Sequence, residues 1–140
     1  MTVTSSLALA LSELLDLLES GSLKTGVQMP IQRGSATGFV VVIPDPRDPT
    51  RETVEVRLTI MEVPREREIA LLRRLLELNG TFHGRAAFAL SEDGLVLLIA
   101  GRTTMDLDPG ELVDLVLWTA EQADYFDDIL LAEFGYGNRA

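Results

Sequence analysis

The chain has 140 residues and a formal net charge of -10, with one histidine and no cysteine. The lack of cysteine excludes a disulfide, a thiolate metal site and a cysteine nucleophile, and a lone histidine, His83, excludes a multi-histidine metal site within one chain. The acidic balance argues against nucleic acid and membrane surfaces as partners, because both attract basic proteins, and it favours basic or apolar protein partners.

The length most simply fits one domain, with a core large enough to need no covalent or metal support. We expect residues 1–134 to form this domain and residues 135–140 to form a flexible tail. The leucine-rich start is unlike a signal peptide, because it lacks a basic segment and contains Glu13 and Asp16. No apolar stretch approaches the roughly 20 residues that span a bilayer, so we expect a cytoplasmic protein.

The first predicted helix covers residues 6–19, with Ser5 or Ser6 as its cap. Leu9 and Leu17 fall off its main apolar face, so the helix carries more leucine than one side of a core requires. Such a helix is either deeply buried or offers a partner-binding surface. The main face consists of Leu7, Leu11, Leu14, Leu15 and Leu18.

Three strands are predicted next. Residues 27–32 alternate in polarity around Pro30, which cannot donate to a ladder and therefore places this strand at a sheet edge. Residues 39–43 are apolar on both faces, which is typical of a central strand covered on both sides. After a stiff proline-rich loop at 44–49, residues 54–60 alternate as in a strand with one wet face.

A second helix and a hairpin follow. The helix is predicted from residue 65 to 78, because Asn79 and the next glycine form a stop signal. Residues 95–100, the second arm of the hairpin after an Asp-Gly turn, are again apolar on both faces. The main apolar stripe of the helix is predicted at Ile69, Leu72, Leu75 and Leu76, with Leu71 and Leu78 on a second side.

The last helix begins with a strong start signal. Asp108 is its cap, Pro109 occupies its first position and Glu111 completes a capping box. Its apolar stripe predicts a helix that reaches Phe134, about 39 Å long at the usual rise. Because strands typically span only about 17–20 Å, we expect the helix either to break near Ala123 or to overhang the sheet.

Trp118 and Tyr125 lie off the main stripe of this helix, whereas Phe126 lies on it and is expected in the core. Aromatic side chains often anchor partner contacts, although a second buried side of the helix would explain the two residues equally well.

The predicted order of elements is α-β-β-β-α-β-β-α. Because the helix-free links between strands are short, the sheet should be mainly antiparallel, with about five strands and three helices in an α+β sandwich. Two strands are apolar on both faces, which is more surface than three helices cover. A partner subunit could supply the missing cover.

A succession of helix stops, turns and apolar runs characterises the second half of the chain, from about residue 66 to residue 134. It consists of Leu71-Leu72 through Leu75-Leu76-Glu77-Leu78-Asn79, Gly84, Phe88-Ala89-Leu90, Asp93-Gly94-Leu95-Val96-Leu97, Asp106-Leu107-Asp108-Pro109-Gly110-Glu111-Leu112 and Ala123-Asp124. This succession resembles the type III secretion chaperone-like superfamily, which includes the CesT-type chaperones and the YbjN-type proteins, and the element order of the whole chain also fits.

This resemblance implies a homodimeric, acidic, non-enzymatic fold without a cofactor. Secretion chaperones of this type hold an extended client segment against the first helix and the sheet, where an exposed edge strand can add main-chain pairing. The alternative is a regulatory or structural dimer of the YbjN type with no extended client. We predict partner contacts at Leu9, Leu17, Val40, Val42, Trp118 and Tyr125, and dimer contacts at Ile69, Leu72, Leu76, Leu95 and Leu97.

Three features contain residue types that occur in chemical sites, but each has a simpler interpretation. Residues 34–38 lack the Gly-Lys-Ser/Thr ending of a phosphate loop and favour a simple turn. His83 lacks a serine or carboxylate placed to work with it as a general base. A row of carboxylates could ligate a hard cation but lacks a second liganding segment; it consists of Glu121, Asp124, Asp127 and Asp128. We therefore predict no catalytic, metal or cofactor site.

Overall fold

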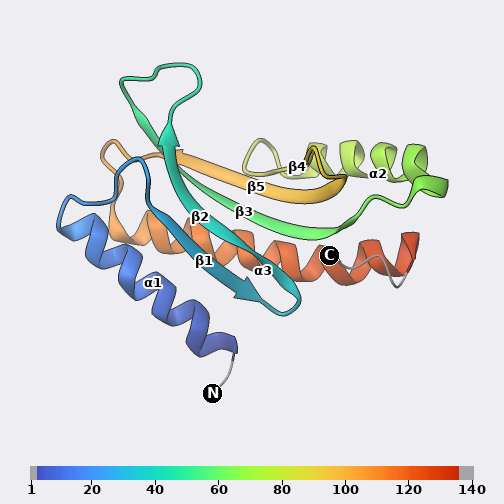
Figure 1. Ribbon diagram of the computed structural model, residues 1–140, viewed down its shortest axis with the longest axis horizontal. Helices are drawn as coiled ribbons and strands as arrows, with labels where there is room; N and C mark the ends of the chain where they lie inside the picture. Colours follow the sequence, from blue (N-terminus) through green and yellow to red (C-terminus); the bar gives the residue numbers. More distant parts are fainter. Residues whose placement is uncertain (1–2, 136–140) are drawn as a thin grey trace.

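The computed structural model describes residues 3–135, with side chains from Ser6 onward (Figure 1). Within that range no helix is long and apolar enough to cross a membrane. Most of the predicted tail, residues 136–140, lies outside the described residues. The elements are α1 (Val3–Glu19), β1 (Gln28–Arg33), β2 (Ala36–Pro44), β3 (Glu52–Glu62), a 3-10 turn (Arg65–Arg67), α2 (Glu68–Thr81), β4 (Ala87–Leu90), β5 (Leu95–Thr103) and α3 (Pro109–Phe134).

The strands form one antiparallel sheet in the order β1-β2-β3-β5-β4. Helices α1 and α3 lie against one face of this sheet, and α2 runs beside β4 at its end (Figure 1). The predicted α+β fold, with three helices and five antiparallel strands in the order α-β-β-β-α-β-β-α, is confirmed.

Among residues 3–135, helices cover only one face of the sheet. Val54, Val56 and Leu58 of β3 are fully buried on the helix-covered face, as the alternation of residues 54–60 predicts. The full cover expected for residues 39–43 and 95–100 is missing, because α2 packs at the sheet end. Phe39 is 42% exposed on the uncovered face, which we call the open face.

The β1–β2 hairpin is tighter than predicted. Its turn is formed by Gly34 and Ser35 alone, and residues 36–38 already pair within β2. Gly38 is required there, because a Cβ atom at this position would lie 1.8 Å from the carbonyl oxygen of Arg57. Pro30 does occupy an edge strand, as its missing N–H predicts.

Helix α1 begins at Val3, so Ser5 and Ser6 lie within it instead of capping it. Helix α2 continues to Thr81, beyond the predicted stop at Asn79. The Asn79 side chain instead pairs with the backbone of β4: it accepts from Phe88 N at 2.6 Å and donates to Phe88 O at 3.2 Å. Asn79 thereby occupies the outer edge of β4 as a neighbouring strand would.

Helix α2 is rotated relative to its predicted stripe. Leu71, Leu75 and Leu78 face the core, whereas Ile69 and Leu76 are 81% and 71% exposed. The two candidate stripes differ by about one residue of rotation, and both are rich in leucine. The packing partners, and not the spacing, decide which stripe is buried.

Helix α3 is continuous from Pro109 to Phe134 and does not break near Ala123. The predicted capping box is present: Asp108 Oδ1 accepts from Glu111 N at 2.7 Å, and Glu111 Oε1 accepts from Asp108 N at 3.0 Å.

The far end of α3 is fastened to the start of α2. Glu133 forms an ion pair with Arg74 at 3.1 Å and accepts a hydrogen bond from Arg67 on its carbonyl oxygen. The Arg67 guanidinium lies 4.7 Å from the centre of the Phe134 ring. These contacts support the end of the helix where it passes beyond the strands.

We expect Asn79→Ala to lower the free energy of unfolding by about 1–3 kcal/mol, because both Phe88 backbone groups lose their partner in a part-buried position. Urea unfolding followed by circular dichroism measures this. Gln28→Ala, which removes an exposed amide from β1, is the matched control. Equal stability of the two variants would contradict the edge-capping role.

Candidate protein-binding surfaces

The open face carries two apolar stripes on either side of a polar middle strand. Strand β3 contributes the polar side chains, with Glu55 and Arg57 at its centre. The Arg57 Nε atom lies 2.5 Å from Glu55 Oε1. The stripes consist of Phe39, Val41 and Ile43 on β2 and of Leu95, Leu97 and Ile99 on β5.

A shallow hollow of about 510 Å³ lies on this face, over the β1–β2 end of the sheet. Arg57 and Thr59 line it from β3, Phe39 from β2 and Pro30 from β1, and Leu97 reaches it from β5. The hollow is lined by apolar side chains together with hydroxyl, amide and guanidinium groups. Such a surface can receive a side chain or an extended segment of another protein.

Val40 and Val42 are not on this face. Both side chains are buried on the helix-covered side of the sheet, so a segment that docks on the sheet would meet Phe39 and Val41 instead. Successive side chains of a strand point to opposite faces of the sheet. Because residues 39–43 are all apolar, the sequence does not show whether the odd-numbered or the even-numbered side chains point inward, and the prediction for Val40 and Val42 was wrong for this reason.

Helix α1 exposes one of its two surplus leucines. Leu9 is 58% exposed, whereas Leu17 is half-buried and packs against the core. Leu7, Leu11 and Leu14 are buried as predicted. The free apolar surface of α1 is therefore centred on Leu9.

Helix α2 offers a second apolar surface, the α2 stripe, which consists of Ile69, Leu72 and Leu76. Together with Arg73 and Glu77 it lines a hollow of about 570 Å³. The predicted dimer contacts thus lie on two separate surfaces. Ile69, Leu72 and Leu76 form the α2 stripe, whereas Leu95 and Leu97 of β5 belong to the open face.

The aromatic residues of α3 differ in environment. Trp118 is half-buried, and it packs edge-on against Phe82 at 5.9 Å between ring centres. The guanidinium of Arg85 lies 3.9 Å from the centre of the Trp118 ring and also pairs with Asp114 at 2.7 Å. Tyr125 is 61% exposed, which leaves it the freer of the two predicted contacts.

The carboxylate row of α3 receives the β1–β2 turn. Ser35 donates a hydrogen bond to the buried carboxylate of Asp127, Arg33 pairs with Asp124 at 3.9 Å, and Gly34 lies directly against Asp124. No group of three or more metal-ligating side chains occurs within residues 3–135. The glycine-rich turn and the acidic row, which are far apart in the sequence, therefore contact each other in the structure.

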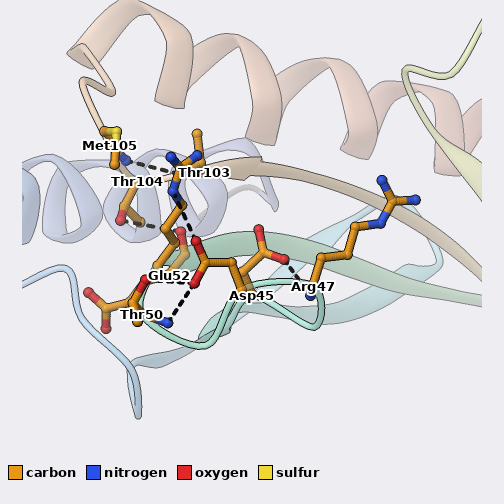
Figure 2. Close-up of polar contacts among 9 residues, drawn as sticks. Asp45, Arg47, Thr50, Glu52, Thr103, Thr104 and Met105 are labelled. Carbon is orange, nitrogen blue, oxygen red and sulfur yellow. Dashed lines mark hydrogen bonds and ion pairs between the residues drawn. The ribbon is translucent and has the colours of Figure 1, made fainter.

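The other polar candidates lie at loops. His83 is exposed and adopts a left-handed backbone conformation with a φ of 53°. The loop between β2 and β3 is held by its own aspartates: Asp45 accepts from Arg47 N at 2.8 Å, and Asp48 accepts from Thr50 N at 3.1 Å (Figure 2). The stiffness of residues 44–49 stays a prediction, and these hydrogen bonds are in keeping with it.

Glu52 joins three segments at the same end of the sheet. Its backbone carbonyl accepts from Thr104 N at 2.9 Å (Figure 2). Its carboxylate accepts from the Thr25 hydroxyl at 2.7 Å and from the Thr25 N–H. The pKa of Glu52 is lowered below its ordinary value of 4.5, mainly by the hydrogen bond from the Thr25 hydroxyl. The hydrogen bond from the Thr25 N–H lowers this pKa further.

Comparison with known proteins supports the fold. No protein-family model matches the chain, and no curated protein matches its sequence. Among solved structures, one chain of the crystal structure of the ExsC–ExsE complex matches with a TM-score of 0.60 and 16% identity, over 89% of this chain and 95% of that chain. At this identity the likeness shows the fold alone, and it supports the predicted arrangement of three helices and five antiparallel strands.

We expect Ser35→Ala to reduce the free energy of unfolding by about 1.5–3 kcal/mol, because a buried carboxylate loses a hydrogen bond from a hydroxyl group. Thermal and urea unfolding give the value. Ser12→Ala, which removes an exposed hydroxyl from α1, is the control. A loss of under about 0.5 kcal/mol, typical of a surface substitution, would show that the turn does not depend on this contact.

The pKa of Glu52 is lower in the folded chain than in the unfolded one, so its ionised form stabilises the fold above the unfolded pKa of about 4.5. This contribution is lost as the pH falls through the folded pKa. We therefore expect Glu52→Gln to be less stable than the unmodified chain at pH 7, with a difference that shrinks below about pH 4. Urea unfolding at a series of pH values tests this, and a difference that grows on acidification would contradict it. Glu13→Gln is the matched control.

Proposed function

We propose that this chain is a non-enzymatic, homodimeric, chaperone-like protein-binding module of the cytoplasm that acts without a cofactor. The observation that carries the proposal is the exposure of large aliphatic and aromatic side chains on three surfaces of a type III secretion chaperone-like fold. Contiguous exposed apolar surface on a folded domain marks sites of protein contact.

The proposed dimer contact includes the α2 stripe and the β5 side of the open face. Ile69 and Leu76 are largely exposed, although the solvated face of a helix normally carries polar side chains. Leu95 and Leu97 are only half-buried. Burial of these side chains by a second copy would remove the apolar surface from water, which is the main driving force for association.

The proposed client contact is centred on Leu9 of α1, with Tyr125 of α3 as a further anchor. The net charge of -10 favours a client that is apolar with basic flanks. Main-chain pairing at a sheet edge is disfavoured, because Pro30 interrupts β1 and Asn79 occupies the outer edge of β4. The client would therefore be held through side chains.

The second candidate function is a regulatory or structural dimer of the YbjN type with no extended client. The position of Leu17 favours it, because this residue packs against the core of its own chain and leaves Leu9 as the main exposed leucine of α1. In that case Leu9 should become buried in the dimer.

We expect Leu9→Asp to abolish the capture of a client by the tagged protein in its native host, as read by affinity purification and mass spectrometry, because the charge cannot be desolvated against an apolar segment. Ser12→Asp adds the same charge to an exposed position of α1 and should leave capture unchanged. Retention of every partner by Leu9→Asp would rule out the α1 surface.

A further inference from the structure

The open face carries apolar side chains on both sides of a polar middle strand, and no helix of the described chain covers it. Its two stripes lie on β2 and β5, the neighbours of the central strand β3. Pro30 in β1 and the Asn79 amide beside β4 each disfavour the addition of a strand at a sheet edge. The open face is therefore the more accessible route for a partner of this sheet.

Strand register arranges the open face in rows that run across the strands. One central row aligns Phe39, Arg57 and Ile99, and the next aligns Val41, Glu55 and Gly101. The row beyond the first contains Thr37, Thr59 and Leu97, and the row beyond the second contains Ile43, Thr53 and Thr103.

The charges at the centre of the face are self-complementary. Arg57 and Glu55 are adjacent on the same side of β3, the middle strand of five. A twofold axis that crosses the strands between these two residues places Arg57 of one copy over Glu55 of the other, and the reverse. An isologous contact of this kind satisfies both charge pairs at once.

The same operation matches the shapes of the rows. The row with Ile99 meets the row with Gly101, so the larger side chain faces the position that has none. The hollow beside Thr59 meets the row that carries Ile43, an apolar side chain able to fill it. The two β2 stripes face each other, and so do the two β5 stripes.

We propose that a second copy of this chain docks on the open face, sheet against sheet with antiparallel β3 strands, and that Arg57 and Glu55 form a reciprocal four-charge cluster at the centre. This rests on the proposed homodimer and extends its contact from β5 across β3 to β2. Two faces packed in this way cross at about 30° because each sheet is twisted.

Charge exchange tests the central cluster. Arg57→Glu and Glu55→Arg each place like charges opposite one another, so we expect each single variant to weaken dimerisation at least about tenfold in sedimentation equilibrium. The double variant Arg57→Glu with Glu55→Arg restores opposite charges and should return to within about threefold of the unmodified chain. Arg51→Glu and Glu13→Arg change the net charge equally elsewhere and should have little effect.

Cross-linking tests the register without changing these charges, and the absence of native cysteine provides a clean background. Position 59 of one copy faces position 53 of the other, so Thr59→Cys chains mixed with Thr53→Cys chains should be joined by a short bismaleimide. Thr59→Cys alone should not, because its two thiols lie about 20 Å apart along the strands.

The outcomes separate this inference from the proposed function. If the dimer survives all the charge variants but is lost in Ile69→Asp with Leu76→Asp, the open face is not the interface and the homodimer stands. A chain that is monomeric at every concentration overturns both, and it leaves the open face to a client. Equal cross-linking of Thr59→Cys alone and of the mixture also overturns the register.

Discussion

The packing of α3 along one face of the sheet is the contact on which the rest of the structure depends. The helix is fixed at its start by the Asp108 capping box and near its end by Arg74 of α2 and Arg67 of the preceding 3-10 turn. Between these points Asp127 receives the β1–β2 turn through Ser35. One long helix thereby aligns the edge strand, the central strands and α2 relative to one another. Because α3 and α1 lie on the same side, the opposite face of the sheet is left open.

Much of this arrangement is local and could be predicted from the sequence. The edge position of β1 follows from Pro30, the inward face of β3 follows from strict alternation, and the start of α3 follows from its capping residues. What the sequence could not decide are choices between equally apolar alternatives. The run of residues 39–43 fits either parity, and α2 carries leucine on two sides. Long-range contacts such as Ser35 with Asp127 left no local signal at all.

The exposed apolar surfaces share one physical origin. A two-layer fold with its helices on one side cannot bury both faces of strands that are apolar throughout. The surplus appears as Phe39 and its neighbours on the open face, as Ile69 and Leu76 on α2, and as Leu9 on α1. Because they are separate in space, one surface is free for the proposed second copy while another is free for the proposed client. The acidic charge of the chain would repel unrelated acidic proteins.

The closed edges of the sheet bear on how many copies can gather. A sheet with free edges can recruit strands without limit and grow into a fibre. Here the proline in β1 and the Asn79 amide beside β4 remove that route at both ends. The association proposed above would then use faces of the molecule, and a face filled by one partner recruits no further copy. The chain can therefore expose apolar side chains on its faces without growing into a fibre through its sheet edges.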